Sequence, residues 1–422
     1  MSGATFQYED IGGTIHAPSS KSYSQRMILL SAASDYPITL LGISFCEDEL
    51  AALEMARQCG SNVIIDHERV TIDPHFRCPA AVNVGESATL YRISLGFLAA
   101  LGCKTEFNGS PDLARRPLRP LISALTEAGV NFHLKDDGFY IMDAKKRRSV
   151  KIGMNQDISS QFVSSMIFYN ALLGSDLPLV TCDKRVSQSY IEITLDVLDK
   201  FGYRVKQEEG SFNFLGRHPS GREFFVEGDF SSALFPAVLG SLCSENGIRI
   251  TGLAAGSKQA DRMALETLAS ASTGISMESR GEKIEIKSAL SAFESVEIDA
   301  SLVPDSCPPV SVVGIFSESG VRVLNYERLR TKESDRVSAI REMVIGFGGV
   351  LVEEGRFFSV TKGTPHFPLE YYGKDHRMLM SAITAGLAVH GQTRFYNLEV
   401  VKKSYPGYLD DLRSLGVTLI PA

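Results

Sequence analysis

The segment KQADR at residues 258–262 returns 74 residues later as KESDR at residues 332–336. Around each copy the chain follows one order: an amphipathic helix, a glycine and a short apolar strand. Six segments have this order, and their glycines are Gly60, Gly129, Gly202, Gly274, Gly349 and Gly416. The spacing of 67 to 75 residues is longer than that of solenoid repeats, which is about 20 to 50 residues. The sequence therefore predicts six copies of one unit.

The turn residues of each unit predict the order of its helices and strands. A glycine after a helix supplies the left-handed conformation that ends it, and pairs such as Asp137-Gly138 and Arg280-Gly281 suit hairpin turns. A second helix comes earlier in each unit, and these helices begin near Ser22, Thr89, Ser160, Ser231, Asp305 and Asp375. Each unit reads as β-α-β-α-β-β, so we expect an α/β (α+β) protein with helices packed on sheets.

The two chain ends suggest how the units are grouped. The sixth unit stops at Ala422, before its second hairpin strand, whereas residues 6–15 resemble a strand that precedes the first helix. We expect this piece to supply the missing strand. The first domain would then be 20–227 and the second 1–19 plus 228–422, with two chain crossings as a hinge and the active site in the cleft between the domains.

Composition excludes several classes of protein. The 422 residues are 44% hydrophobic and 22% charged, with a net charge of -7, which argues against a general nucleic-acid binder. The amino end lacks the pattern of a signal or transit peptide, and the apolar run 93–103 is too short for a bilayer, so we expect a cytoplasmic protein without membrane contact. The seven cysteines are scattered without a Cys-x-x-Cys pair, so we expect reduced, mostly buried thiols and no structural zinc.

The loops that lead into the helices are rich in polar and basic residues. Residues 18–26 read PSSKSYSQR, and the serines either cap the helix or, together with Lys21, Ser22 and Arg26, hold an anion; both interpretations stay open. Eight cations occupy equivalent loops: Lys21, Arg26, Arg92, Arg116, Lys332, Arg336, Arg377 and Lys403. If these loops share one face, they suit a small substrate that carries phosphate and carboxylate groups.

Three further loop residues are candidate proton carriers. Asp305 is either the N-cap of a helix or a catalytic base, and Glu333 is either part of a local ion pair or a catalytic acid. His376 is either a third proton carrier or a hydrogen-bonding orienter. The sequence has no Walker loop, no Gly-x-Gly-x-x-Gly after a strand and no metal-ligand spacing, so we expect no nucleotide cofactor and no metal.

At this point the chain resembles the 3-phosphoshikimate 1-carboxyvinyltransferase (EPSP synthase) family over essentially its whole length. The resemblance rests on these motifs: PSSKSYSQR at 18–26, RP at 116–117, SSQF at 159–162, SQSYIEIT at 187–194, EGDFSS at 227–232, PD at 304–305, LRTKESDR at 329–336, DHRM at 375–378 and KSYP at 403–406. It implies two domains, each with three units around a pseudo-threefold axis, the inside-out α/β barrel.

The implied reaction transfers the enolpyruvyl group of phosphoenolpyruvate to the 5-hydroxyl of shikimate 3-phosphate and releases phosphate through a tetrahedral intermediate. The resemblance implies that both substrates are small molecules and that the enzyme acts as a monomer. It also implies these roles: Ser159, Ser160 and Ser187 on the shikimate phosphate; Ser22 and Arg26 on its carboxylate, near Tyr190; Lys21, Arg116, Gln161 and Lys403 on the phosphate of phosphoenolpyruvate; Arg336 and Arg377 on its carboxylate; and Asp305 and Lys332 on the hydroxyls. Asp305 would take the hydroxyl proton, Glu333 would protonate the methylene carbon, and Lys21 and His376 would assist.

The sequence departs from the family in the loop 85–89, where GESAT replaces the common Gly-Asn-Ala-Gly-Thr. Glu86 stands in place of an amide and Ala88 in place of a glycine close to phosphoenolpyruvate. The methyl group of Ala88 should therefore disfavour the longer inhibitor glyphosate more than the substrate. Sensitive inhibition that is unchanged by Ala88→Gly would contradict this hypothesis.

Two other functions remain open. The enolpyruvyl transferase that acts on UDP-N-acetylglucosamine has the same fold. A chain of that kind would carry a reactive cysteine in the loop near Arg116, and residues 110–120 of this chain contain no cysteine. A non-catalytic phosphometabolite sensor would have no need of both Asp305 and Glu333. Phosphate release from phosphoenolpyruvate that requires shikimate 3-phosphate would separate the three functions.

Overall fold

The computed structural model describes residues 3–154, 159–175, 177–181, 188–208, 210–289, 291, 294–332 and 334–421. The chain divides into two compact bodies. The N-terminal body is Ser19–Val226, and the C-terminal body joins Met1–Pro18 to Glu227–Ala422. Each boundary lies one residue before the position given by the repeat in the sequence.

The N-terminal body alternates helices and short strands. Its elements are α1 (Lys21–Ala32), β3 (Ile38–Leu41), α2 (Glu47–Gln58), β4 (Asn62–Asp66), β5 (Arg69–Asp73), β6 (Ala81–Asn83), α3 (Ala88–Ala100), β7 (Lys104–Asn108), α4 (Pro111–Ala114), α5 (Arg119–Glu127), β8 (Asn131–Leu134), β9 (Tyr140–Asp143), β10 (Ile152–Met154), α6 (Ser160–Leu173), β11 (Leu179–Thr181), α7 (Gln188–Lys200), β12 (Tyr203–Glu208), β13 (Ser211–Arg217) and β14 (Glu223–Phe225).

The C-terminal body repeats this alternation. Its elements are β1 (Ala4–Gln7), β2 (Gly13–His16), α8 (Phe230–Cys243), β15 (Ile248–Ala254), α9 (Asp261–Ser270), β16 (Ile275–Arg280), β17 (Lys283–Ser288), β18 (Val296–Asp299), α10 (Cys307–Phe316), β19 (Val321–Leu324), the 3-10 helix η1 (Tyr326–Thr331), α11 (Arg336–Gly346), β20 (Val350–Glu354), β21 (Phe357–Thr361), β22 (Glu370–Tyr372), α12 (His376–Ala388), β23 (Arg394–Tyr396), η2 (Leu398–Lys403), α13 (Tyr408–Ser414) and β24 (Thr418–Pro421).

The described residues form six four-stranded sheets with one shared pattern. In the sheet β18-β19-β21-β20, the first two strands are parallel and β19 then pairs antiparallel with the hairpin β20–β21. The sheets β6-β7-β9-β8 and β10-β11-β13-β12 follow the same order. This is the β-α-β-α-β-β unit predicted from the sequence.

The chain start supplies two strands to two different sheets. Strand β1 pairs antiparallel with β23 and β24 and takes the place of the missing hairpin strand in the sixth unit. Strand β2 instead pairs in parallel with β15, while β14 pairs in parallel with β3. The expectation of a single strand over 6–15 was therefore wrong in extent: the two bodies each receive a first strand from the segment that precedes a chain crossing.

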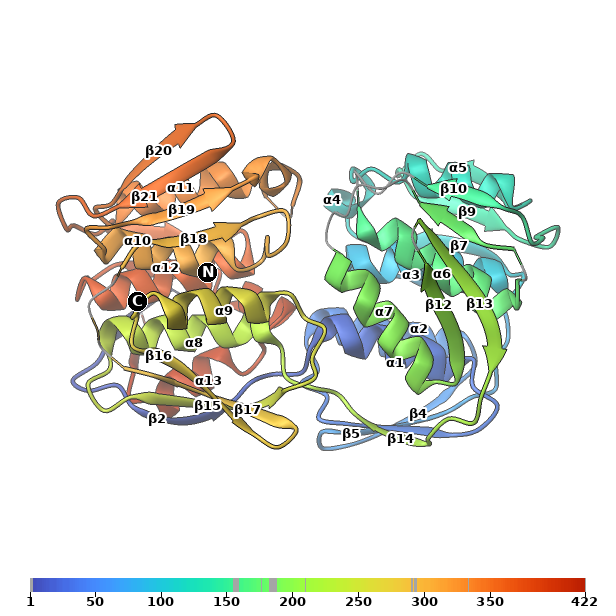
Figure 1. Cartoon of the computed structure of the whole chain (residues 1–422), viewed down its shortest axis with the longest axis horizontal. Helices are drawn as coiled ribbons and strands as arrows, with labels where there is room; N and C mark the ends of the chain where they lie inside the picture. Colours follow the sequence, from blue (N-terminus) through green and yellow to red (C-terminus); the bar gives the residue numbers. More distant parts are fainter. Residues whose placement is uncertain are drawn as a thin grey trace. The chain divides into compact units, whose positions relative to one another are not determined.

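One helix of each unit is buried on all sides. In the C-terminal body, each of α8, α10 and α12 contacts the other two. Figure 1 shows these helices between strands β18–β21 and strands β15–β17. Nearly every residue of α8 is buried, because a helix surrounded by apolar neighbours has no solvent face. The helices α1, α3 and α6 lie in the core of the N-terminal body, where α3 contacts both α1 and α6. This is the inside-out arrangement of a helical core within sheets.

Glycine ends the helices where the sequence predicts, except after α9 and α11. After α9, which ends at Ser270, the first left-handed residue is Ser272, with a φ of +55°, and the predicted Gly274 comes two residues later. Gly129 follows α5 with a φ of +84°, and a Cβ atom there would lie 2.5 Å from the carbonyl oxygen of Lys146. After α11 the left-handed residue is Gly348, with a φ of +89°, and not the expected Gly349. Two successive glycines are chemically equal candidates for a helix end, so only the packing distinguishes them.

The expectation that all cysteines are reduced was wrong for one pair. Cys78 and Cys103 form a disulfide, with Cα atoms 5.1 Å apart. The parallel register pairs Ala81 with Glu106, so the same register three residues earlier brings these two cysteines opposite each other. The cysteines at 46, 59, 243 and 307 are free and buried, and Cys182 lies outside the described residues.

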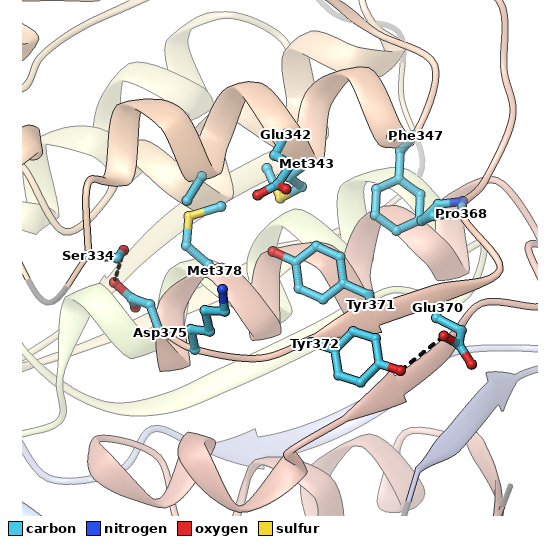
Figure 2. Close-up of a pocket in the computed structure, with 13 residues that line it drawn as sticks. Ser334, Glu342, Met343, Phe347, Pro368, Glu370, Tyr371, Tyr372, Asp375 and Met378 are labelled. Atoms are coloured by element: carbon cyan, nitrogen blue, oxygen red, sulfur yellow. Dashed lines mark hydrogen bonds between the residues drawn. The ribbon is translucent and has the colours of Figure 1, made fainter.

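The described residues also show two further features, which concern membrane-spanning helices and a cavity. No helix in the described ranges is long and apolar enough to cross a membrane. Within the C-terminal body, α11 and the segment around β22 enclose a cavity of about 420 Å³ (Figure 2).

Candidate active site

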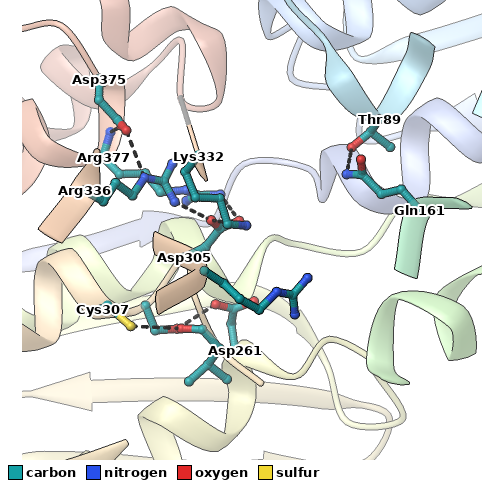
Figure 3. Close-up of polar contacts among 12 residues, drawn as sticks. Thr89, Gln161, Asp261, Asp305, Cys307, Lys332, Arg336, Asp375 and Arg377 are labelled. Carbon is teal, nitrogen blue, oxygen red and sulfur yellow. Dashed lines mark hydrogen bonds and ion pairs between the residues drawn. The ribbon is translucent and has the colours of Figure 1, made fainter. Parts of the chain in front are cut away.

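A cluster of charged side chains lies at the starts of helices α10, α11 and α12 in the C-terminal body. Arg336 donates from Nη1 to Oδ1 of Asp305 at 2.7 Å, and Arg377 donates from Nη2 to Oδ2 of the same carboxylate at 3.0 Å (Figure 3). The ammonium of Lys332 lies 3.7 Å from Oδ1 of Asp305. Three of the predicted cations thus converge on the predicted base, from segments 27 to 72 residues away.

The N-cap alternative for Asp305 was wrong. Helix α10 begins at Cys307 and its N-cap residue is Ser306, so Asp305 precedes the cap and its carboxylate binds the two arginines. Burial by itself raises the pKa of Asp305, but Arg377, Lys332 and Arg336 outweigh it and hold that pKa well below its ordinary value. Asp305 is therefore a carboxylate in this arrangement.

Asp375 connects the cluster to the start of α12. Its Oδ1 accepts a hydrogen bond from the backbone N–H of Arg377, which caps the helix. Its Oδ2 accepts from Nε of Arg336 at 2.9 Å and from Oγ of Ser334 at 3.3 Å. Both Arg336 and Asp375 are buried, so this pair orients the arginine from the side opposite Asp305. His376, a candidate proton carrier, is the buried first residue of α12, and its Nδ1 lies 3.6 Å from Oδ1 of Asp375.

A second buried acid lies beside Asp305. Asp261, the first residue of α9, accepts a hydrogen bond of 2.6 Å from Oγ of Ser306. Burial, together with the negative charge of Asp305, raises the pKa of Asp261 to about 6. No local sequence pattern assigned a site role to Asp261 or Asp375, although the repeat of residues 258–262 at 332–336 marks the loop of Asp261 as equivalent to that of Arg336.

The N-terminal body gathers a set of neutral and basic groups at its buried helices. Gln161 accepts from Nη1 of Arg92 at 2.6 Å and donates from Nε2 to Oγ1 of Thr89 at 2.8 Å (Figure 3). Ser159 is the N-cap of α6 and accepts from the backbone N–H of Gln161, while Ser160 is the first residue of the helix. Capping is thus shown for Ser159, and both serines are buried.

Arg26 is enclosed inside the N-terminal body. It donates to Oγ1 of Thr194 at 2.9 Å and to the carbonyl oxygens of Ser22 and Tyr190 at 2.6 and 3.4 Å. Burial lowers the pKa of its guanidinium to about 10. These contacts hold together Ser22 and Arg26, which are predicted to contact the carboxylate of shikimate 3-phosphate, and Tyr190, which is predicted to lie nearby.

Lys21 begins helix α1 and forms an ion pair of 2.9 Å with Asp48, a partner that no sequence motif indicated. The N-cap residue of this helix, Ser20, makes no side-chain cap hydrogen bond. The capping alternative for the loop 18–26 is therefore not supported at Ser20, and the first turn instead presents Lys21 and Ser22, both half-buried.

The remaining predicted residues are distributed over both bodies. Arg116 is half-buried between α4 and α5, Glu86 is exposed, and Ala88 is the buried first residue of α3. Lys403 is half-buried at the end of η2, in the C-terminal body. Ser187 and Glu333 lie outside the described residues. The predicted phosphate ligands Lys21, Arg116 and Gln161 thus belong to one body and Lys403 to the other.

The fold is the one found in solved enolpyruvyl transferases, and it defines a structural class. An EPSP synthase from Acinetobacter baumannii has this fold, with a TM-score of 0.82 at 21% identity over the whole of both chains. The enolpyruvyl transferase NikO from Streptomyces tendae also has it, with a TM-score of 0.77 at 17% identity over 100% of this chain and 99% of that one.

Sequence comparison narrows the class. The profile of EPSP synthase (3-phosphoshikimate 1-carboxyvinyltransferase) matches residues 7–412. A 3-phosphoshikimate 1-carboxyvinyltransferase from Picrophilus torridus is 39% identical over 411 residues, which cover 97% of both chains. One from Thermoplasma acidophilum is 37% identical over 405 residues, which cover 95% of both. The chain belongs to the EPSP synthase family.

Proposed function

We propose that this chain transfers the enolpyruvyl group from phosphoenolpyruvate to the 5-hydroxyl of shikimate 3-phosphate, in the biosynthesis of aromatic amino acids. The family supports this reaction. In the addition step, the hydroxyl oxygen bonds to the central carbon of phosphoenolpyruvate, the hydroxyl proton leaves to a base, and an acid protonates the methylene carbon. In the elimination step, that methyl group loses a proton, phosphate leaves, and the enol ether forms.

The observation that carries the assignment of roles is the position of Asp305 between Arg336 and Arg377. Without substrate, this carboxylate is the counter-ion of both arginines. The carboxylate of phosphoenolpyruvate would take its place on them, because planar guanidinium groups bind carboxylates in this geometry. Nη1 of Arg377 is buried and has no hydrogen-bond partner among the described residues, so it supplies a donor for the incoming oxygen.

This exchange of partners also explains how Asp305 acquires basicity. While two arginines and Lys332 surround it, its lowered pKa makes it a weak base. When the substrate carboxylate takes over the arginines, the attraction that favours the charged form of Asp305 decreases and its pKa rises. Asp305 then accepts the proton of the 5-hydroxyl. Binding of one substrate thus prepares the group that activates the other.

The other roles follow the family motifs. Glu333 protonates the methylene carbon, with Lys21 and His376 assisting. Lys332 contacts the hydroxyls. Shikimate 3-phosphate binds at the N-terminal body through Ser22, Arg26 and Tyr190 on one side and Ser159, Ser160 and Ser187 on the other. Lys21, Arg116, Gln161 and Lys403 bind the phosphate of phosphoenolpyruvate. The enzyme acts as a monomer in the cytoplasm.

The decisive experiment measures phosphate release from phosphoenolpyruvate with and without shikimate 3-phosphate, and with UDP-N-acetylglucosamine instead. Release only with shikimate 3-phosphate is expected. Release with the nucleotide sugar would assign the chain to the other transferase activity, and binding without release would make it a sensor.

Asp305→Ala and Glu333→Gln test the roles. Each should lower kcat by about 10²–10⁴-fold, because each removes a proton-transfer group. Binding of phosphoenolpyruvate, followed by calorimetry, should persist in Asp305→Ala, since the two arginines lose their internal counter-ion. Asp136→Ala, on an exposed turn, is the matched control. Wild-type turnover in either variant would refute the roles.

A further inference from the structure

The cavity beside helix α11 has the size of a small-molecule site. Its volume of about 420 Å³ falls within the range of about 300–1,000 Å³ that is usual for ligand pockets. Its walls come from α11, from the segment 368–375 and from the first turn of α12, so it lies wholly within the C-terminal body. None of the residues with a predicted substrate role lines it.

One side of the cavity is apolar and aromatic. Met343, Phe347 and Met378 are buried side chains that line it, and the ring of Tyr371 forms a further wall (Figure 2). Pro368 closes this side. Thioether groups and aromatic rings favour a flat, polarisable ligand, because sulfur and ring edges both make attractive contacts with an aromatic ring.

Two of the acidic side chains that line the cavity already have hydrogen-bond partners, whereas two other charged side chains have no ion-pair partner among the described residues. Glu370 already accepts hydrogen bonds from the hydroxyls of Tyr372 and Tyr396, at 2.9 and 3.2 Å. Asp375 is engaged by Ser334, by Arg336 and by the start of α12. Glu342 on α11 and Lys374 after β22 are exposed, and neither has an ion-pair partner among the described residues. Among the described residues, the cavity therefore offers one carboxylate and one ammonium group without an ion-pair partner, beside an apolar wall.

We propose that this cavity binds an aromatic α-amino acid. The ring would lie against Met343, Phe347 and Tyr371, the ammonium group would pair with Glu342, and the carboxylate would pair with Lys374. A ligand with only one of these charges would leave one side chain without its partner. Binding as such does not depend on the proposed function.

The cavity also touches the support of the active-site cluster. Ser334 and Asp375 line it, and the oxygen of Asp375 that accepts from Ser334 also accepts from Nε of Arg336. An occupant that displaces Ser334 would shift Asp375 and, through it, the guanidinium of Arg336. The amino acid should therefore alter the KM for phosphoenolpyruvate, an inference that rests on the proposed function.

Calorimetry with the full chain tests binding directly, with L-phenylalanine as the probe. We expect saturable binding of one molecule, and about fivefold weaker binding of 3-phenylpropionate, which lacks the ammonium group, and of phenethylamine, which lacks the carboxylate. Glu342→Gln and Lys374→Met should each weaken L-phenylalanine binding by a similar factor. The matched controls Glu354→Gln and Lys283→Met change exposed residues elsewhere and should bind as the wild type does.

Gly346→Leu should block the cavity and leave the fold intact. A Cβ atom on Gly346 meets only Cγ of Pro368, at 3.9 Å, so a larger side chain has room to enter the cavity. This variant should keep the circular dichroism and melting temperature of the wild type and lose L-phenylalanine binding. No binding to the wild type, or equal binding to Gly346→Leu, would overturn the proposal.

The coupling is read from steady-state kinetics on the same proteins. L-Phenylalanine should change the KM for phosphoenolpyruvate at least twofold in the wild type and not in Gly346→Leu. An unchanged KM at saturating L-phenylalanine would overturn the coupling. An inactive wild type that still binds L-phenylalanine would refute the proposed function and leave the binding site supported.

Discussion

The two copies of the five-residue motif have opposite burial. In the copy at 258–262, Asp261 is buried and Arg262 is partly exposed, where it pairs with Glu266 one turn along α9. In the copy at 332–336, Arg336 is buried and Asp335 is 42% exposed. The same residue types at the same offset therefore place an acidic side chain in the core of one unit and a basic side chain, the guanidinium of an arginine, in the core of the next.

The two aspartates consequently respond to pH in opposite directions. Burial and Asp305 raise the pKa of Asp261 to about 6. Asp335 caps α11 by accepting from the backbone N–H groups of Val337 and Ser338. Partial burial alone raises its pKa, but hydrogen bonds from Ser338 and the charge of Arg330 outweigh this and lower it. The repeated motif thus returns at a helix start in each unit, but its aspartate is the first residue of α9 in one copy and the N-cap of α11 in the other, and its neighbours decide its chemistry.

Removing the two arginines should produce the largest difference between the copies. Arg336→Met leaves the buried Asp375 without its arginine and leaves Asp305 with Arg377 as its remaining arginine, so the free energy of unfolding should fall by about 3–5 kcal/mol. Turnover should also fall by about 10²-fold or more, because a donor to the substrate carboxylate is lost. Arg262→Met removes a helix-surface pair and should change stability by about 0.5 kcal/mol or less. Denaturant titrations and steady-state kinetics measure both, and similar losses in the two variants would contradict the comparison.

Neutralising the buried aspartate should have an intermediate effect that grows with pH. Since the pKa of Asp261 is raised from 3.8 to about 6, the folded protein holds a proton between these values that the unfolded chain has released. Stability therefore falls as pH rises through this window. Asp261→Asn should match the wild type near pH 4 and exceed it by about 1–3 kcal/mol at pH 7. Urea unfolding across this range measures the difference, and a variant that is less stable at pH 7 would show that the charged form is needed.

Removing the exposed aspartate should have the smallest effect, with the reverse pH dependence. Because the folded-state pKa of Asp335 is lowered, its contribution is present at neutral pH and is lost as pH falls through that pKa. Asp335→Ala also removes the cap of α11, so it should cost about 1 kcal/mol at pH 7 and less in acid. Asp335→Asn, which retains a capping oxygen, is the control and should lose much less. A cost for Asp335→Ala that is constant with pH would assign the effect to packing.

Much of the fold was predictable from local signals. The six units, their hairpins and the grouping of a strand from the chain start with the sixth unit all follow from the period and from glycine at helix ends. The second N-terminal strand, β2, was missed because its partner β15 lies 235 residues further along the chain at Ile248–Gly13. The disulfide was missed for the same reason, since only the β6–β7 register brings Cys78 to Cys103.

The candidate site was predictable in its residue types and not in its contacts. Asp305, Lys332, Arg336 and Arg377 were identified from their places at helix starts, where free N–H groups and cations favour anions. The sequence at these helix starts did not indicate that Asp375 would orient Arg336 or that Asp261 would lie beside Asp305. Each of these two contacts joins residues of different units, so it depends on how the units pack together.

The sequence by itself determined the repeat, the ends of most helices and the presence of charged residues at the helix starts. Glycine conformation and apolar periodicity act over a few residues, so they can be read without knowing the rest of the chain. Only the tertiary structure decided which charge of each motif is buried, which strand completes which sheet and which arginines share Asp305. Burial and ion pairing depend on distances between segments far apart in the chain, and these distances exist only once the sheets and core helices have assembled.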